Sequence, residues 1–202
     1  MNRWDILNKL IKKNNYKNYL EIGVQNPSSN FDKINCENKV GVEPNVYDWH
    51  RGTPPTFVGT SDEYFEAIKD SDIKFDIVFI DGLHHDDQVI RDIENSLNIL
   101  NSEGTIVVHD CLPSNEREQE RDDHGGVWLG DVWKGIAHLR ITRDDIKIEV
   151  VDTDLGCGVI TKNESTKWDT NGEVWNEYPY YFNNKKGLMN VISVQEFVNK
   201  YL

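Results

Sequence analysis

Three features that would direct this chain to a membrane, a disulfide framework or a nucleic acid are missing. None of its apolar runs approaches the length needed to cross a bilayer. Its three cysteines are widely spaced, and their odd number, with no CxxC pair, argues against a disulfide framework. With 22 Lys and Arg against 35 Asp and Glu, the formal net charge of −13 would repel a phosphate backbone. We therefore expect a globular protein that binds neither membranes nor nucleic acids.

The N-terminus also lacks the continuous apolar segment of a signal peptide. Trp4, Leu7, Leu10 and Ile11 recur at helical spacing among polar residues, a pattern typical of an amphipathic helix. A cytoplasmic location is the simplest expectation for such a chain.

The most informative stretch present is Phe75–Asp110. Phe75–Ile80 is a short apolar run rich in β-branched residues, as expected of a buried strand. Asp86–Leu100 carries apolar residues at helical spacing, and Thr105–Val108 is a second buried strand. Because two strands joined through a helix run parallel, this stretch predicts a right-handed β-α-β unit.

Acidic and histidine side chains follow both strands of this unit. Asp81, His84 and His85 come after the first strand, and His109 and Asp110 end the second. Ligands of open α/β sheets bind at the carboxyl ends of parallel strands. We therefore expect these five residues to converge on one edge of one sheet.

The rest of the chain continues the alternation of strands and helices. Thr60–Glu63 and Ser193–Glu196 each show the S/T-x-x-E pattern that opens a helix. A polar tract at 113–126 is typical of a loop. Further strands are expected at 18–24, 39–43, 56–58, 146–152 and 158–161, the last two as a hairpin, and a further helix at 127–140. This order indicates one α/β domain with a mostly parallel sheet.

Two residues at the start of the sheet suggest a nucleotide site. The first strand ends at Gly23, where the backbone can approach a ligand closely. The next strand ends at Glu43, about 20 residues later, the spacing at which a carboxylate takes a pair of ribose hydroxyls.

These motifs resemble a known family. LEIGV, an acid ending the second strand, FDIVFIDG and a strand ending in HD are similar to class I S-adenosylmethionine (SAM)-dependent methyltransferases. More narrowly, IDGLHH and the segment NSEGTIVVHDC resemble the metal-dependent macrocin-type O-methyltransferases of sugars and small molecules. The resemblance covers residues 18–161. It implies a Rossmann-like, seven-stranded, mostly parallel sheet with helices on both faces and a C-terminal antiparallel hairpin.

The resemblance also implies a layout and a cofactor site. Residues 1–202 would form a single methyltransferase domain, with an N-terminal helix at 1–17, the core at 18–161 and an aromatic, helical tail at 162–202. The residues implied to bind SAM are Glu21, Gly23, Glu43, Ser61, Asp62 and Asp81. The chain departs from the family after the first turn, where Val24–Ser28 contains Pro27 in place of a second glycine.

Metal-dependent relatives imply a divalent ion, Mg²⁺ or Mn²⁺, held here by Asp81, His109 and Asp110. Carboxylate oxygens suit such a hard cation. His109 replaces an acid common in relatives, so it either binds the ion directly or contacts the residues that bind the ion. By resemblance His84 is the general base, with His85 as the competitor, because an imidazole has a near-neutral pKa.

The expected function is methyl transfer from SAM to a hydroxyl of a sugar, nucleotide-sugar or other polyhydroxylated small molecule, within polysaccharide biosynthesis. One alternative is a SAM-binding or interaction protein whose site has decayed, as the missing second glycine hints. Another, an NAD-dependent oxidoreductase, is disfavoured because no G-x-G-x-x-G follows the first strand. We expect the loop at 113–126 and the aromatic tail to shape the acceptor pocket. Assembly into a homo-oligomer stays open.

Overall fold

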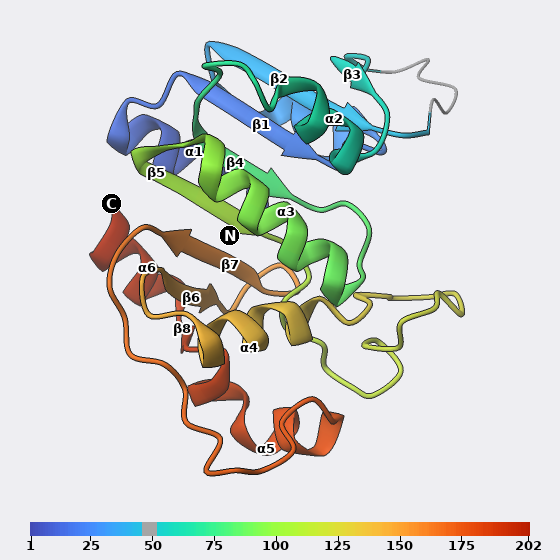
Figure 1. Cartoon of the computed structure of the whole chain (residues 1–202), viewed down its shortest axis with the longest axis vertical. Coiled ribbons are helices and arrows are strands. Elements are labelled where there is room, and N and C mark those ends of the chain that lie inside the picture. The colour runs from blue at the N-terminus through green and yellow to red at the C-terminus, as the bar shows by residue number, and fades with distance from the viewer. Residues whose placement is uncertain (46–51) are drawn as a thin grey trace.

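A single eight-stranded sheet forms the centre of the molecule (Figure 1). The computed structural model describes residues 1–45 and 52–202. The strands lie in the order β3-β2-β1-β4-β5-β7-β6-β8. Neighbours from β3 to β5 are parallel, whereas β7 is antiparallel to both β5 and β6. The strands are β1 (Asn18–Ile22), β2 (Asn38–Glu43), β3 (Phe57–Val58), β4 (Phe75–Ile80), β5 (Leu100–Val108), β6 (Lys147–Val151), β7 (Cys157–Thr161) and β8 (Val191–Ile192).

Helices cover both faces of this sheet. One core cluster joins the sheet to α2, α3, α4 and α5, and a second joins it to α1 and α6. The helices are α1 (Arg3–Asn14), α2 (Ser61–Ile68), α3 (Asp86–Ile99), α4 (Val132–Thr142), α5 (Tyr178–Leu188) and α6 (Val194–Tyr201), with short 3₁₀ turns at Pro27–Ser29 and Phe31–Lys33. No helix within the described ranges is both long and apolar enough to cross a membrane.

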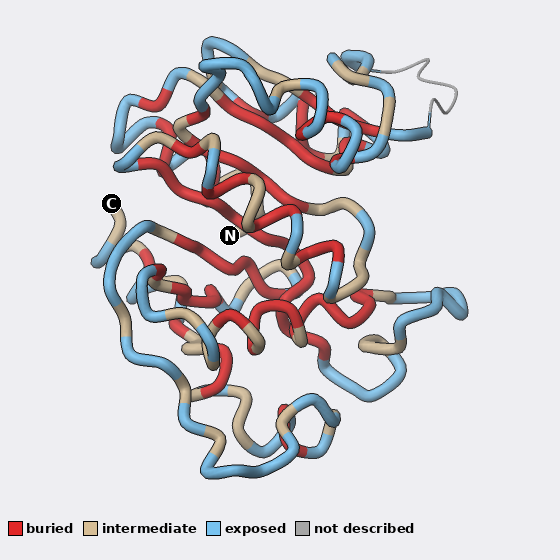
Figure 2. The backbone as a smooth tube through the Cα atoms, viewed as in Figure 1, coloured by how far each residue is buried: buried red, intermediate tan, exposed pale blue. Residues whose placement is uncertain are grey.

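The strands are buried on both sides because their side chains alternate between the two clusters. Leu20 and Ile22 of β1 pack in the cluster with α2–α5, whereas Tyr19, the residue before Leu20, packs in the cluster with α1. In β4, Val78 and Phe79 divide in the same way. Figure 2 shows the result as a band of buried strands through the centre, with exposed backbone mainly in the loops.

The predicted α/β class, the parallel sheet with helices on both faces and the antiparallel hairpin are confirmed. The sheet has one strand more than the seven expected, because the two residues of β8 pair with the outer side of β6. A second difference concerns β5, which begins at Leu100 rather than Thr105. The Lys162 ammonium donates to the Leu100 carbonyl at 2.8 Å, and Phe75 pairs with Leu100 before the register shifts.

Both capping boxes expected from the sequence are present. The backbone N–H of Glu63 donates to the Thr60 hydroxyl, and that of Glu196 donates to the Ser193 hydroxyl, each at 3.2 Å. The reciprocal bonds from the cap residues to the glutamates are also made. The first box starts α2 directly after β3, so the beginning of that helix faces the carboxyl edge of the sheet.

Candidate active site

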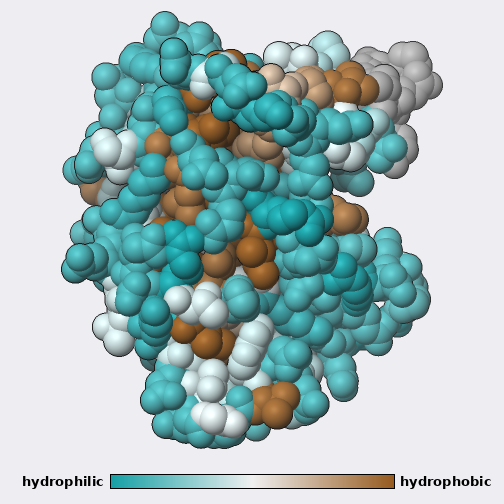
Figure 3. Space-filling model, in the orientation of Figure 1, coloured by the Kyte–Doolittle hydropathy of each residue, from teal (hydrophilic) through white to brown (hydrophobic). Residues whose placement is uncertain are grey.

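The carboxyl ends of the parallel strands open into one cleft of about 760 Å³. In Figure 1, β1 and β4 run toward the side on which the space-filling view of Figure 3 is hollowed. Nine of the residues singled out from the sequence line this cleft: Glu21, Gly23, Glu43, Ser61, Asp62, Asp81, His84, His109 and Asp110. His85 is the one that does not. The convergence follows from the parallel order of β2, β1, β4 and β5.

Gly23 forms the turn after β1 and lies directly against the turn after β4. Its φ is +85°, a conformation that favours glycine, and an added Cβ would lie 2.2 Å from the Asp81 carbonyl oxygen. No other residue fits this contact. The close approach keeps the two turns together at the floor of the cleft.

Glu21 lies beneath that floor, with 1% of its surface exposed. Its carboxylate accepts hydrogen bonds from the Tyr19 hydroxyl and, at 3.0 Å, from the Asn30 amide. Burial raises the pKa of Glu21 to about 8, and the nearby charge of Asp81 adds to the rise, although the two hydrogen bonds oppose it. Near neutral pH this carboxyl therefore holds a proton in the ligand-free protein.

The raised pKa predicts a pH-dependent stability. An unfolded Glu21 loses its proton near pH 4.5 and the folded one only near pH 8, so the folded state binds more protons between these values. The unfolding free energy should then fall as the pH rises from 5 to 8. Glu21→Gln removes the titrating group. Chemical denaturation without added ligand should show that the unfolding free energy of this variant falls between pH 5 and 8 by about 2–4 kcal/mol less than that of the wild type. Parallel pH profiles for the two proteins would contradict this role of Glu21.

Glu43, at the end of β2, is buried and connects two turns. Its Oε2 accepts from the Gln25 backbone N–H at 2.8 Å, and its Oε1 accepts from that of Asn45 at 3.0 Å. The carboxylate therefore orders the turn after β1 as well as its own, and still lines the cleft. A carboxylate has about four acceptor positions, so these two bonds leave acceptors for a ligand.

The start of α2 is joined to α3 through a buried amide. The Gln88 side-chain nitrogen donates to Ser61 Oγ at 3.1 Å, to Asp62 Oδ1 at 3.2 Å and to Asp92 Oδ1 at 2.9 Å. Burial raises the pKa of Asp92 to about 6. This network fixes Ser61 and Asp62 at the start of α2, where both line the cleft.

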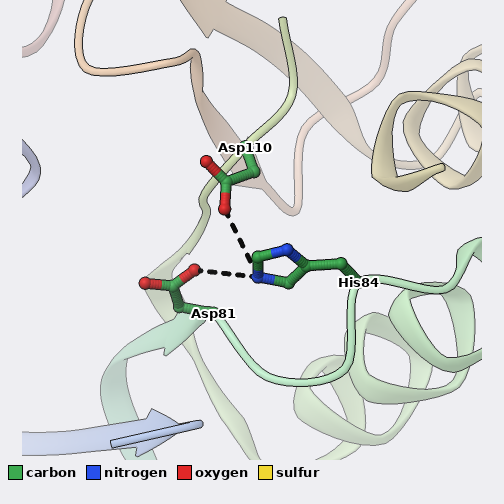
Figure 4. A group of neighbouring side chains, drawn as sticks. All are labelled: Asp81, His84 and Asp110. Carbon is green, nitrogen blue, oxygen red and sulfur yellow. Dashed lines mark ion pairs between the residues drawn. The ribbon is translucent and has the colours of Figure 1, made fainter. Parts of the chain in front are cut away.

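Asp81, His84 and Asp110 form the centre of the cleft (Figure 4). One potential ligand atom from each lies within 4.8 Å of the other two. The Nε2 of His84 lies 3.5 Å from Asp81 Oδ1 and 3.3 Å from Asp110 Oδ2. Burial alone would lower the pKa of His84, but the two carboxylates outweigh it and raise that pKa.

His109 lies beside this group and contacts the same two carboxylates. Its Nδ1 is 3.3 Å from Asp81 Oδ1 and 3.1 Å from Asp110 Oδ1, and its Nε2 faces Asp154 at 3.7 Å. Although burial opposes it, the charge of Asp81 raises the pKa of His109 well above its usual value, with the other two carboxylates adding to the effect. Both histidines therefore face the same pair of carboxylates, and the assignment of His109 as a metal ligand stays a prediction.

Unsatisfied buried atoms concentrate at this cleft. Six buried side-chain nitrogen or oxygen atoms in the described part of the chain lack a hydrogen-bond partner, and five belong to cleft residues: Arg3 Nε, Asn30 Oδ1, His84 Nδ1, His109 Nδ1 and Asp110 Oδ1. Asp110 also has φ +59°, a strained backbone for a non-glycine residue. Buried polar groups are normally paired, so these atoms set the cleft apart from the rest of the described chain.

His84 is held by residues that the sequence analysis did not single out. Its ring stacks on Trp128 with the centroids 4.8 Å apart. Gly130, with φ +61°, lies so close that an added Cβ would be 2.0 Å from the His84 carbonyl oxygen. The indole of Trp128 in turn donates to the Glu120 carbonyl at 2.8 Å. Because these contacts join loop to turn, helical or strand periodicity carries no signal for them.

His85 has a different position, as the residue before α3. Its carbonyl accepts the N–H of Val89 at 2.9 Å, but its side chain makes no capping bond. Asp131 instead accepts the N–H of Asp86 at 2.8 Å. His85 therefore lies at the helix entrance, outside the lining of the cleft.

The loop at 113–126 contributes Asp123 and Gly126 to the lining of the cleft, whereas the aromatic tail contributes none of its described residues. Within the loop, Arg121 forms ion pairs with Asp86 and Asp131 at 2.8 and 3.1 Å, which attach the loop to α3. In the tail, the rings of Tyr181 and Trp133 of α4 pack with their centroids 4.6 Å apart. The described tail residues do not line the cleft. The tail expectation was wrong because its rings complete the hydrophobic core on α4.

The fold of the chain and part of its sequence are similar to those of methyltransferases. Residues 37–111 match a family model described as a methyltransferase domain. No curated protein matches the chain. Among solved structures, the chain is similar to the O-methyltransferase TomG from Streptomyces achromogenes in complex with SAM, with 15% identity, a TM-score of 0.59 and coverage of 80% of this chain and 79% of that one.

Two further solved structures are similar to the chain in fold. A putative O-methyltransferase from Klebsiella pneumoniae has 14% identity, a TM-score of 0.58 and coverage of 80% of each chain. The O-methyltransferase from Bacillus cereus in complex with SAH has 16% identity, a TM-score of 0.55 and coverage of 78% of each chain. Residues 37–111 thus resemble a methyltransferase domain, and the chain as a whole shares the fold of these O-methyltransferases.

Proposed function

We infer that this protein is a SAM-dependent O-methyltransferase that acts on a hydroxyl group of a sugar or another polyhydroxylated small molecule, assisted by a divalent ion. The observation that carries the proposal is the continuity of one cleft. The cleft runs from Glu43 and Asp62, past Gly23, to the group Asp81, His84 and Asp110. The proposed cofactor site and the group proposed to activate a hydroxyl would thus lie in the same cleft.

The cleft residues fit SAM, which supplies a methyl group activated on a sulfonium. Glu43 retains free acceptors at the position expected for the ribose hydroxyls. Ser61 and Asp62 would lie along the adenine, and Gly23 leaves room for the methionine part. Glu21 beneath the turn would favour the positive ammonium group once its own proton is released.

The centre of the cleft also fits a divalent ion. Asp81 and Asp110 would hold it through carboxylate oxygens, with the Nδ1 of His109 facing the same two carboxylates. Asp110 Oδ1 and His109 Nδ1 are buried 3.1 Å apart and have no hydrogen bonds to other groups, so an ion bound here would take over their contact. Such an ion would orient the acceptor oxygens and lower the pKa of the hydroxyl to be methylated. A nitrogen ligand favours Mn²⁺ over Mg²⁺.

The chain's own residues would move the proton. His84 projects into the cleft between Asp81 and Asp110, and Trp128 holds its ring in place. An acceptor hydroxyl bound there would give its proton to the His84 imidazole as the new O–C bond forms. The orientation of the ring and the burial of the two carboxylates keep the base positioned before the acceptor enters.

The charge of the cleft narrows the class of acceptor. Six carboxylates line it: Glu21, Glu43, Asp62, Asp81, Asp110 and Asp123. This field would disfavour the pyrophosphate of a nucleotide-sugar and favour an uncharged or cationic polyhydroxylated acceptor.

Methyl transfer from labelled SAM to panels of neutral sugars and nucleotide-sugars tests this preference. Binding of NAD is the measurement that tests the oxidoreductase alternative. A protein that binds SAM but transfers no methyl group with any divalent ion would be the decayed form. The cytoplasmic location and participation in polysaccharide biosynthesis stay predictions.

The ribose assignment predicts the effect of Glu43→Ala. The change removes the acceptor for the ribose and leaves the N–H groups of Gln25 and Asn45 without their partner. We expect SAM binding to weaken by about 1.5–3 kcal/mol, the range for hydrogen bonds to a charged group. Isothermal titration calorimetry measures it, with Glu66→Ala on the exposed side of α2 as a control. Equal SAM affinities for wild type and Glu43→Ala would remove Glu43 from the site.

A further inference from the structure

The acidic cleft contains a single permanent cation in the described part of its lining. Arg3 stands among six carboxylates, and no lysine or second arginine is present there. SAM carries two positive groups, the sulfonium and the ammonium, which suit such a field, and one carboxylate, which does not. A cofactor carboxylate bound here needs a donor that the acids do not provide.

Backbone donors near the methionine end are already used. In many anion sites the N–H groups of a glycine-rich turn bind the ligand. Here most backbone N–H groups of the turn after β1 already donate to β2 or to the turn itself, and Pro27 has none. The bonds run from Gly23 and Val24 to the Val42 carbonyl, from Gln25 to the Glu43 carboxylate, and from Ser28 and Ser29 to Asn26. The departure from a second glycine thus removes donors that a carboxylate would use.

Arg3 is anchored by its backbone while its guanidinium keeps spare donors. Its backbone N–H donates to Asp154 Oδ2 at 2.7 Å. The guanidinium makes only long contacts, from Nη1 to Asp154 and to His109 Nε2 at 3.4 Å each and from Nε to Asp81 at 4.0 Å. The Nε is buried without a hydrogen bond. A guanidinium has five N–H donors, so most of these remain available for a ligand.

The position of Arg3 corresponds to the methionine end of the cleft. Its Nε lies 4.0 Å from Asp81 Oδ2, and the backbone of Asp81 packs directly against Gly23 at the end of β1. The ribose end, at Glu43, lies beyond Gly23 on the other side of β1. A ligand carboxylate at this end would meet the guanidinium fork that matches it in shape.

We propose that Arg3, from the first turn of α1, binds the carboxylate of the methionine moiety of SAM. This inference rests on the proposed cofactor. Arg3 replaces the backbone donors that the turn after β1 has lost. The assignment makes the N-terminal helix part of the cofactor site rather than only a cover for the sheet.

The test compares two ligands that differ only in the carboxylate, SAM and decarboxylated SAM. Arg3→Met removes the charge and keeps an unbranched side chain. It should weaken SAM binding about 10- to 100-fold, as expected for hydrogen bonds between charged groups, and leave the affinity for decarboxylated SAM unchanged. Lys9→Met, which removes an exposed charge from the same helix, should change neither affinity.

Arg3→Lys provides the second variant, because Arg3 also contacts Asp154 and Arg3→Met could fold poorly. A lysine keeps the charge but loses the planar fork, so the ratio of SAM to decarboxylated-SAM affinity should fall to an intermediate value. The inference is overturned if either folded variant keeps the wild-type ratio. If wild-type protein binds neither ligand, the proposed function itself is wrong, and the two failures are therefore distinguishable.

Discussion

Replacing Asp110 with asparagine should lower kcat by about 10²–10⁴-fold, which corresponds to an activation free energy several kcal/mol higher. Asp110 is 5% exposed, and its Oδ1 forms an ion pair with His109 Nδ1 at 3.1 Å. The neutral amide is a weaker ligand for a hard cation and leaves Asp81 as the only carboxylate of the group. SAM affinity should stay nearly unchanged, because the ion would serve the acceptor.

Three measurements complete this test. Chelation with EDTA should abolish turnover of the wild type, and Mn²⁺ or Mg²⁺ should restore it. Direct titration of Mn²⁺ should show weaker binding by Asp110→Asn. Asp122→Asn, an exposed acid of the loop that does not line the cleft, should behave as wild type. Full activity in excess EDTA would exclude the ion from the mechanism.

Replacing His84 with alanine should have an effect of similar size, for a different reason. A positioned general base typically contributes about 10²–10⁴-fold to a rate. His84 lies in the cleft against both carboxylates, and its ring is fixed by Trp128. Without it, kcat should fall by that factor while the affinities for SAM and for Mn²⁺ remain. His85→Ala should change the rate little, because His85 lies outside the cleft.

The affinity for Mn²⁺ separates the two roles open to His84. The ring lies close enough to the carboxylates to complete a ligand set with them. If His84→Ala loses Mn²⁺ binding and His109→Ala does not, His84 is a ligand and the base lies elsewhere. If His85→Ala is the inactive variant, the assignment within the pair is reversed. If neither His84→Ala nor His85→Ala alters the rate, no histidine of this turn is the base.

The strand ends of this site could be predicted from local sequence, because each is marked by a short apolar run followed by a polar residue. Asp81 and Asp110 follow two such runs, and Glu43 ends a third. Once the strands are parallel, their carboxyl ends share one edge of the sheet, and the side chains there converge. The same local reasoning missed β8, whose two residues form a strand only by pairing with β6.

The sequence by itself thus determined the class of fold, the positions of the central strands along the chain and the convergence of the acids. Only the tertiary structure decided which histidine enters the cleft, since adjacent residues of one turn, His84 and His85, point differently. It also brought Arg3 and Trp128 to the site and took the aromatic tail away from it. Periodicity records which face of an element is buried. It does not record which distant loop or helix end meets that face, because packing across the whole molecule sets those contacts.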